Sequence, residues 1–473
     1  MGLEDYLINL LLLTLTVPMA AKATFEKAHR LWLLEQRADS MLVATAFVAF
    51  LVSAIIAARY IIARPVPVYL LDHSCYRPPN RLKLKSRTIL DLVKQSGEFD
   101  DSAVKFMGKI MERSGLGDET FVPEAMLHVP RKRSIAASRE ESELLMFGAL
   151  EDLFRNSGIG PGAIDILIVN CSLFSPAPSL PAMIVSKYRM SKTDFRTYNL
   201  SGLGCSAEVI AIGLAKDLLQ VHRDSYALVV STENITRNGY VGNDKSMLMP
   251  NCLFRLGTAA VLLSNKPGDE KSAKYRLGKL VRTHRGADDE SYKCVYQQED
   301  GRGSVGVSLA RDLPRIAGEG LKTHLGALGP LVLPTAEQLR LLASLARKKF
   351  FEPGAKTYIP NFKLAFEHFC IHTGGRAVID VLEKTLSLSP VHVEASRMTL
   401  HRFGNTSSSS VWYELAYIEA KGRMRGGDRV WQLAFGSGLK CNSAVWVALR
   451  DVAPPAVSPW AECIDEYPVS TSA

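Results

Sequence analysis

Cysteine is sparse and scattered in this chain of 473 residues, where the eight cysteines stand at positions 75, 171, 205, 252, 294, 370, 441 and 463. No two of them form a Cys-x-x-Cys pair, and they lack the dense spacing of small secreted proteins. The sequence therefore predicts neither a zinc module nor a disulfide scaffold, and it favours a reducing compartment. No basic stretch alternates with aromatic residues, which argues against nucleic-acid binding.

The composition excludes a disordered protein. Hydrophobic residues make up 47% of the chain and charged residues 22%, and the length suggests two or three domain-sized units with a large core. The formal net charge of +9 suits an anionic partner, such as a phosphate-rich cofactor or a negative membrane face. Scattered lysines on an ordinary solvated surface would give the same balance.

Two uncharged apolar runs near the N-terminus predict a membrane anchor in residues 1–64. The run 40–58 has 19 residues without a charge, about the length that spans a bilayer. The run 6–21 is shorter, so it is interpreted either as a span or as a segment lying in the interface. Glu4 and Asp5 argue against a cleaved signal peptide. Basic residues dominate positions 59–87, which by the positive-inside rule places the following part in the cytosol.

The rest of the chain reads as an α/β catalytic body. Short apolar runs at 165–170, 226–231 and 259–264 predict buried strands, and helical patterns at 142–156 and 207–223 alternate with them. We expect an N-terminal half at 65–266 and a C-terminal half at 267–452, joined by the polar stretch 265–274. The proline-containing tail 453–473 is expected to be extended or loose.

Cys205 is the first candidate catalytic residue. It lies in NLSGLGCSA at 199–207, where a short strand runs through Gly202 and Gly204 into an apolar helix. Glycines permit a sharp turn there, and a helix N-terminus is expected to lower the pKa of a thiol. This pattern favours a nucleophile, whereas the alternative is an inert cysteine packed in the core.

His372 follows a predicted strand and precedes two glycines and a helix over 377–386, so its setting mirrors that of Cys205. A neutral histidine at such a turn can act as a base or as a hydrogen-bond donor. His368 and Cys370 alternate with it, which raises the alternative of a metal site, but no fourth ligand with suitable spacing is evident. For His368 a supporting role and a buried structural role are both open.

Asn405 stands after a glycine and before a run of serines, in MTLHRFGNTSSSS at 398–410. The serines are typical helix caps, and Asn405 itself could be a structural residue of the turn. Beside a thiol and a histidine, its amide could instead stabilise a developing oxyanion. His401 is a candidate for orienting Asn405, and the glycine loop 435–438 could line the same site.

Four motifs together carry a family resemblance: NLSGLGCSA at 199–207, GNDKSMLMPNCLFRLG at 242–257, EHFCIHTGGRAVID at 367–380 and MTLHRFGNTSSSSVWYELAY at 398–417. They resemble the plant 3-ketoacyl-CoA synthases, membrane-bound condensing enzymes of very-long-chain fatty acid elongation. That family is similar to type III polyketide synthases. The resemblance implies a thiolase-type fold of two related α/β halves in five layers (αβαβα), preceded by one or two transmembrane helices.

The resemblance also implies the site residues. The family's nucleophile falls on Cys205 and its histidine and asparagine fall on His372 and Asn405. Further family histidines fall on three positions: His284, His368 and His401. Departures from the family pattern are Glu208 in place of a small residue, Gly239 in place of a tryptophan, and Thr258 in place of a glycine.

The implied activity is an acyltransferase that condenses a long-chain acyl-CoA with malonyl-CoA and releases carbon dioxide and CoA. It needs no metal or organic cofactor. The implied partners are the membrane, a second copy and other elongase subunits, and the implied location is the endoplasmic reticulum membrane with the catalytic part facing the cytosol. The alternatives are a polyketide synthase-like enzyme, or a weak or silent subunit that modulates an elongase complex.

Overall fold

The computed structural model describes residues 22, 24–27, 49–55 and 65–470. The predicted spans at 6–21 and 40–58 fall outside these residues, except that 49–55 is helical. Within the described residues, no helix has both the length and the hydropathy needed to cross a bilayer. The chain divides into two compact units, one comprising Met1–Pro67 and Gln220–Asp224, the other Val68–Leu219 and Ser225–Ala473.

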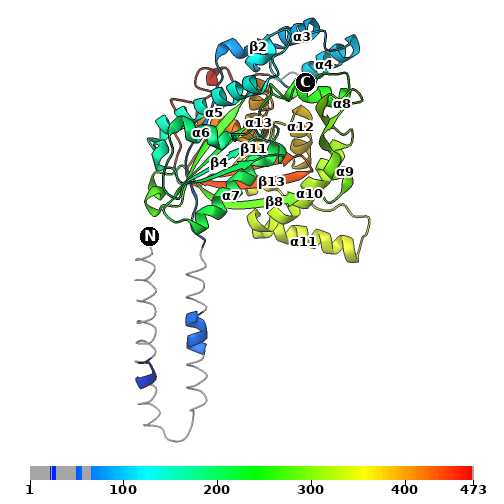
Figure 1. Cartoon of the computed structure of the whole chain (residues 1–473). Helices are drawn as coiled ribbons and strands as arrows, with labels where there is room; N and C mark the ends of the chain where they lie inside the picture. The colour runs from blue at the N-terminus through cyan, green and yellow to red at the C-terminus, as the bar shows by residue number, and fades with distance from the viewer. Residues whose placement is uncertain (1–21, 23, 28–48, 56–64, 471–473) are drawn as a thin grey trace. The chain divides into compact units, whose positions relative to one another are not determined.

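A nine-stranded mixed sheet organises the second unit, with the strand order β11-β12-β13-β8-β1-β7-β6-β4-β5. Helices lie around this sheet, as Figure 1 shows. Its strands are β1 (Tyr69–Cys75), β4 (Ile166–Asn170), β5 (Arg196–Leu200), β6 (Tyr226–Thr232), β7 (Thr258–Ser264), β8 (Tyr275–His284), β11 (His368–Ile371), β12 (Arg429–Gly436) and β13 (Lys440–Ala448). Two small antiparallel pairs join β2 (Lys83–Lys85) with β3 (Glu119–Phe121), and β9 (Val295–Glu299) with β10 (Val305–Leu309).

The predicted strands are confirmed because continuous apolar runs are buried on both faces of a sheet. In β4, Ile166 and Ile168 pack into the core cluster that contains α7 and α14, whereas Leu167 and Val169 pack against α5 and α6. The helices are α3 (Ser86–Gln95), α4 (Asp101–Arg113), α5 (Ile135–Ser157), α6 (Leu180–Tyr188), α7 (Ala207–Val221), α8 (Lys245–Leu253), α9 (Asp289–Lys293), α10 (Leu313–Val332), α11 (Thr335–Phe350), α12 (Arg376–Thr385), α13 (Pro390–Phe403) and α14 (Ser410–Ala420).

The polar stretch 265–274 joins β7 to β8 through a short 3-10 turn, Pro267–Lys271, as expected from its composition. The two strands are nevertheless not neighbours. β1 lies between them, pairing with β7 along its length and with β8 only at Tyr69 and Leu70. β1 therefore joins the strands of the N-terminal half, on the β7 side, to the strands of the C-terminal half, on the β8 side, in one continuous sheet.

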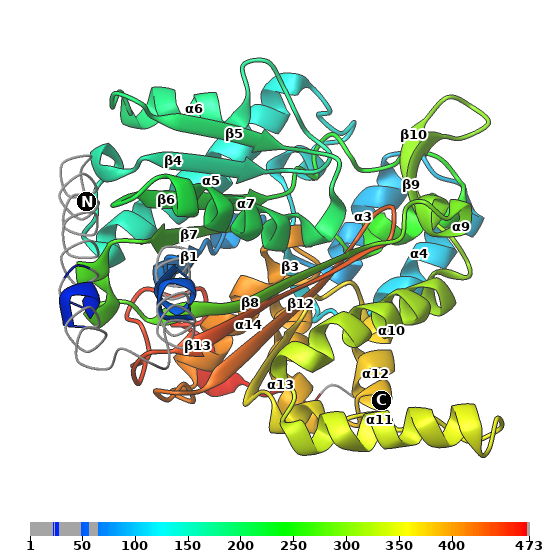
Figure 2. The ribbon, with the colours of Figure 1, turned by 90° about the horizontal axis from the view of Figure 1, so that it is seen from below.

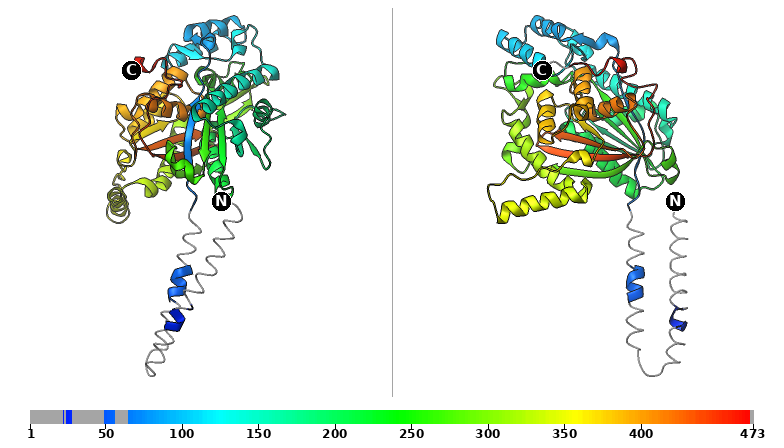
Figure 3. Two further views of the ribbon diagram at one scale, coloured as in Figure 1. Left: turned by 90° about the vertical axis from the view of Figure 1, so that its left-hand side faces the viewer. Right: turned by 180° about the vertical axis from the view of Figure 1, so that it is seen from behind.

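The prediction of a loose C-terminal tail is wrong for residues up to 470. Trp460 is fully buried, and its indole Nε1 donates to the backbone oxygen of Tyr413 in α14 at 2.9 Å. The ring of Trp460 also lies edge-on to Tyr417, with centroids 4.8 Å apart. Up to residue 470 the tail has a single short 3-10 helix, Ile464–Glu466, and Lys421 also donates to the backbone oxygens of Ile464 and Tyr467, so the tail is fixed on the body. Its ribbon runs along the body in Figure 3.

Candidate active site

Polar side chains gather at the carboxyl ends of three neighbouring parallel strands. β4 pairs in parallel with both β5 and β6, so the segments that follow these strands leave the sheet at one edge. Cys205 follows β5, and Glu233 follows β6 directly. Open α/β sheets bind their ligands at such an edge.

The turn that carries Cys205 has the backbone conformation that its glycines predict. Gly202 and Gly204 have φ values of 69° and 71°, in the region that favours glycine. The loop 436–438 packs directly onto this turn, because a Cβ on Gly204 would lie only 2.4 Å from the backbone nitrogen of Ser437. A 3-10 turn, Gly204–Ser206, then leads into α7. The glycine loop 435–438 therefore contacts the turn of Cys205, as the sequence suggested.

The prediction of a lowered thiol pKa is wrong. Burial raises the pKa of Cys205 to about 12; the hydrogen bond from Ser407 lowers this pKa, and the carboxyl group of Glu233 raises it further. The free-energy cost of burying a thiolate away from water exceeds the stabilisation that the helix N-terminus gives to its charge. Cys205 therefore stands in the free protein as a thiol, and it needs a base to become a nucleophile.

Ser407 links the thiol to a buried carboxyl group. Its hydroxyl lies 3.5 Å from the sulfur of Cys205 and 3.1 Å from Oε2 of Glu233. Glu233 also accepts a hydrogen bond from the backbone nitrogen of Leu173 at 2.9 Å. Ser407 has a φ of 57°, rare for a residue with a side chain, and this strain places its hydroxyl between the two groups.

Sequence reasoning missed both Glu233 and Ser407. A signal was available for Glu233, because an acidic residue directly after a buried strand lies at the functional edge of the sheet. Ser407 was hidden among four consecutive serines that all read as caps. Nothing in the sequence brings the two together, since they are 174 positions apart.

His372 leaves the carboxyl end of β11 and is buried. Burial lowers its pKa to about 4, so its imidazole is neutral at physiological pH. Its Nδ1 is paired with the hydroxyl of Ser410 at 2.7 Å, and Nε2 has no hydrogen-bond partner among the described residues. A serine hydroxyl can accept from Nδ1 or donate to it, so either tautomer of His372 is supported.

Asn405 is held by the backbone around it. Its Oδ1 accepts a hydrogen bond from the backbone nitrogen of Ser407 at 2.8 Å, which fixes the orientation of the amide. Within the described part of the chain Nδ2 has no hydrogen-bond partner, so this donor is left for a ligand. The turn is tied to β11 by Thr373, whose hydroxyl donates to the backbone oxygen of Gly404 at 3.1 Å.

Segment 404–410 is thus the common neighbour of the three candidate catalytic residues. Cys205 contacts Ser407, Asn405 accepts from Ser407, and His372 pairs with Ser410. A thiol, an uncharged base with a free nitrogen and an amide donor around one segment suit acyl transfer with oxyanion stabilisation. Their catalytic roles stay predictions at this point.

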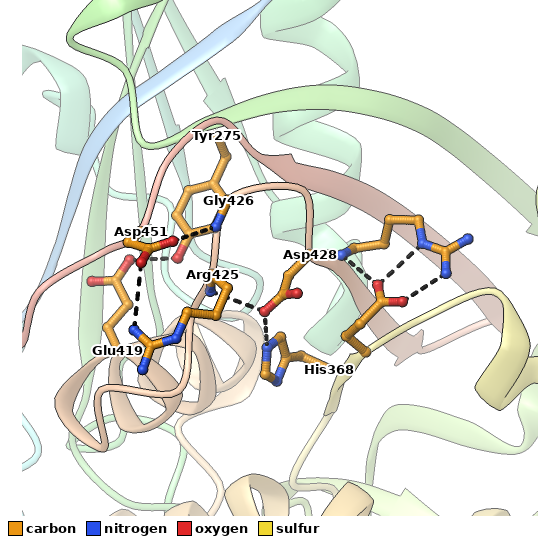
Figure 4. Close-up of polar contacts among 9 residues, drawn as sticks. Tyr275, His368, Glu419, Arg425, Gly426, Asp428 and Asp451 are labelled. Carbon is orange, nitrogen blue, oxygen red and sulfur yellow. Dashed lines mark hydrogen bonds and ion pairs between the residues drawn. The ribbon is translucent and has the colours of Figure 1, made fainter.

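His368 lies at the opposite end of β11 from His372, about 13 Å away along an extended strand. Figure 4 shows its ring against Asp428, with Nε2 2.9 Å from Oδ2. Asp428 also accepts from the backbone nitrogen of Arg425, so the pair braces the turn that leads into β12. The structure does not bring His368 to the thiol.

His401 and His284 are not hydrogen-bonded to any of the three central residues. His401, on α13, has its Nδ1 3.1 Å from the hydroxyl of Tyr467 in the C-terminal tail. His284 is exposed at the end of β8, opposite Lys440 in the strand register, and its Nδ1 accepts from the backbone nitrogen of Gly286 at 3.0 Å. In the described residues no group of three or more histidine, cysteine or acidic side chains is arranged to hold a metal ion.

Glu208 is fully buried in the first turn of α7, facing Glu414 of α14. Among the described residues neither of its carboxyl oxygens has a hydrogen-bond partner, and Oε1 of Glu414 has none either. Burial, and secondarily the charge of Glu414, raises the pKa of Glu208 well above its ordinary value. After burial and Glu233, the charge of Glu208 also raises the pKa of Cys205, and the raised pKa of Glu208 itself means that it keeps its proton to a higher pH than an exposed glutamate does.

Replacing Glu208 with glutamine is expected to reduce the loss of stability at alkaline pH. A raised folded pKa means that the folded chain holds a proton which the unfolded chain has lost, so stability falls as pH rises above about 4.5. The E208Q variant cannot ionise, and its amide can donate to Glu414. Thermal unfolding of the solubilised chain at pH 6 and pH 8 should show a smaller difference for E208Q, by about 1–2 kcal/mol.

The matched control for this experiment is Glu143→Gln, at an exposed position of α5. It should unfold with the same pH dependence as the wild type. If E208Q also kept the wild-type pH dependence, Glu208 would not be the protonated group described above.

The other two departures do not hydrogen-bond to the central residues. Thr258 is buried, and its hydroxyl donates to that of Thr232 at 2.6 Å, so the side chain is fully accommodated in β7. At Gly239 an added Cβ would meet the backbone oxygen of Ile235 at 3.7 Å, an ordinary contact. Nothing in the structure explains the glycine there.

Sequence comparisons were consistent across the chain. The family described as FAE1/type III polyketide synthase-like protein matches residues 60–350, and the chalcone and stilbene synthase C-terminal domain matches residues 346–450. 3-ketoacyl-CoA synthase 4 of Arabidopsis thaliana is 59% identical, covering 99% of this chain and 91% of the relative. 3-ketoacyl-CoA synthase 9 of the same plant is 60% identical, covering 87% of this chain and 80% of the relative.

Two solved structures are similar in fold. A mutant of CsyB matches with a TM-score of 0.63 at 19% identity, covering 81% of this chain and 100% of that chain. The fungal type III polyketide synthase ORAS matches with the same TM-score and identity, covering 80% of this chain and 99% of its own. The chain therefore has the mixed α/β, thiolase-like fold of type III polyketide synthases.

Proposed function

The chain belongs to the 3-ketoacyl-CoA synthase family, and from this membership we propose that it condenses a long-chain acyl-CoA with malonyl-CoA. The products are a 3-oxoacyl-CoA two carbons longer, carbon dioxide and free CoA. The observation that carries the proposal is the meeting of Cys205, His372 and Asn405 around segment 404–410. Each supplies one of the groups that a decarboxylating condensation needs.

In the first half-reaction Cys205 takes the acyl group. Because burial keeps its sulfur protonated, Nε2 of neutral His372 accepts the proton as the sulfur attacks the thioester carbonyl. The tetrahedral intermediate then expels the CoA thiolate, which receives that proton. The result is an acyl-Cys205 thioester and free CoA, with His372 neutral again.

In the second half-reaction malonyl-CoA loses its carboxylate as carbon dioxide. The electron pair of the broken bond forms an enolate, whose oxygen is bound by the amide Nδ2 of Asn405 and by His372 in its Nε2–H tautomer. Ser410 supports that tautomer by donating to Nδ1. The enolate carbon attacks the acyl-Cys205 carbonyl, and the sulfur leaves as a thiolate. This thiolate takes up one proton from solvent to regenerate the thiol.

We propose that the other three predicted histidines support the reaction indirectly, by holding segments around the site in place. His368 braces the turn before β12 through Asp428, and His401 fastens the tail to α13 through Tyr467. His284 caps the end of β8 beside the 436–440 loop that packs on the nucleophile turn. We propose them as positioning residues that do not touch the reacting atoms.

The proposal extends to the setting of the enzyme. The reaction balances without a metal or organic cofactor, since carbon dioxide release drives carbanion formation. We propose that residues 40–58 anchor the chain in the endoplasmic reticulum membrane with the catalytic body in the cytosol, where CoA thioesters are available. A homodimer that works beside other elongase subunits, in the five-layer arrangement of two related halves, is part of the same proposal.

The proposal is tested by expressing the full chain in a yeast that carries the remaining elongation enzymes. Fatty acid profiling should show new chains extended in two-carbon steps, compared with cells that carry an empty vector. Microsomes should extend fatty acyl-CoA and leave aromatic CoA thioesters unused. Extension of aromatic starters alone would instead favour the polyketide synthase-like alternative.

A silent modulating subunit is distinguished by the acyl-enzyme. Incubation of the purified chain with a long-chain acyl-CoA, followed by mass spectrometry of the peptide that contains Cys205, should show the acyl mass. A chain that binds elongase partners and never acylates would be the modulating subunit.

A further inference from the structure

Helix α11 (Thr335–Phe350) carries its apolar side chains on the outside. Leu339, Leu342 and Phe350 are 61%, 60% and 70% exposed, and with Ala346 they lie at i, i+3, i+7 and i+11 on one face. Phe351, directly after the helix, is 80% exposed and extends the row. Figure 2 shows α11 at the edge of the body, outside α10.

The inner side of α11 is held by polar contacts. Glu337 is buried, and it accepts from the hydroxyl of Tyr358 and the backbone nitrogen of Asn361, both at 2.8 Å. About two turns further on, the hydroxyl of Ser344 accepts from the backbone nitrogen of Tyr358 at 2.8 Å. The usual amphipathic order is inverted here, with a glutamate inside and leucines outside. The row therefore does not serve the core of this chain.

The charge around the row is basic. Segment 335–356 has five cationic residues and two acidic ones, and the acids are occupied by Arg340, which pairs with Glu337, and by Arg347, which pairs with Glu352. Lys348 and Lys349 have no carboxylate partner in the described parts of the chain. Exposed leucine and phenylalanine flanked by lysine is the pattern of a helix that lies in a membrane interface.

We propose that α11 is a membrane-surface helix that docks on anionic lipid, with Leu339, Leu342 and Phe350 at the boundary between headgroups and acyl chains. Lys348 and Lys349 then meet the negative headgroups. A second copy of the chain is a poorer occupant of this face. A two-fold contact would bring the same lysines together, with no exposed unpaired acid on α11 to balance them. The inference concerns attachment and does not rest on the proposed reaction.

The test places a tryptophan on the row, as Leu342→Trp in the full chain reconstituted in nanodiscs that contain phosphatidylserine and lipids with brominated acyl chains. The native tryptophans at 412, 431, 446 and 460 are at most 1% exposed, and Trp32 is subtracted with the wild type. Bromine is expected to quench the added fluorescence about twofold or more, because the row reaches the acyl chains. The matched control is Ile135→Trp, 52% exposed at the start of α5, which should not be quenched.

Charge reversal separates lipid docking from other contacts. In the L342W background, Lys348→Glu and Lys349→Glu should each lower the docked population about fivefold, and raised salt should act in the same direction. An L342W signal that acrylamide reaches freely and bromine does not quench would overturn the proposal. Shielding from acrylamide without bromine quenching would also overturn it, because a protein would then cover the row. Bromine quenching and acrylamide accessibility do not depend on catalysis, so a failure of the proposed fatty acid extension would leave both measurements unchanged.

Discussion

Replacing Cys205 with alanine is expected to abolish chain extension, with a fall in malonyl-CoA-dependent rate of at least about 10⁴-fold. Alanine has no group that can carry the acyl chain, and among the described residues Cys205 is the one cysteine whose sulfur is hydrogen-bonded to segment 404–410. The mutation removes only a sulfur atom from a turn whose shape is set by Gly202 and Gly204, so the fold should persist. The measurement is extension of radiolabelled acyl-CoA by microsomes, together with acyl capture on the purified chain.

The control is Cys463→Ala, which removes a nearly buried thiol in the tail, away from segment 404–410. It should retain wild-type extension and an acylated Cys205. Extension by C205A above the rate of empty microsomes would contradict the assignment of the nucleophile. Equal protein levels and equal thermal unfolding of the two variants would show that the difference is chemical.

The three main residues of the site could be predicted from the sequence because each of them lies in a recognisable local pattern. A strand and a glycine turn before a helix start recur at Cys205 and His372, and Asn405 stands in a glycine turn before a run of helix-capping serines. Such patterns need only neighbouring residues to form. The buried strands β4, β6 and β7 were predicted for the same reason, since an uninterrupted apolar run has few other stable environments. The family resemblance added the fold and the identity of the reaction.

What the sequence did not predict depends on contacts between distant segments. The raised pKa of Cys205 results from burial under the 436–438 loop and beside Glu233, and neither is a neighbour in the chain. The order of the tail depends on a cavity that α14 offers to Trp460, which no pattern in the tail itself reports. The inverted polarity of α11 likewise follows from Glu337 meeting Tyr358 and Asn361.

Replacing Asn405 with aspartate is expected to separate the two half-reactions. The new side chain keeps an oxygen to accept from the backbone nitrogen of Ser407, so the turn is preserved. It loses the Nδ2 donor and puts a negative charge where the enolate oxygen develops, which should slow carbon dioxide release by about 10²–10³-fold or more. Acylation of Cys205 should slow by about tenfold at most, because the added charge only raises the thiol pKa further.

The measurement compares acyl capture on Cys205 with release of labelled carbon dioxide from malonyl-CoA in the same preparation. Asn156→Asp, an exposed position at the end of α5, is the matched control and should leave both steps unchanged. Equal losses in the two steps for N405D would show that Asn405 shapes the turn without binding the enolate. A selective loss of decarboxylation would instead place the side chain of Asn405 at the enolate oxygen, because the aspartate removes the donor and adds a negative charge there while it keeps the oxygen that holds the turn.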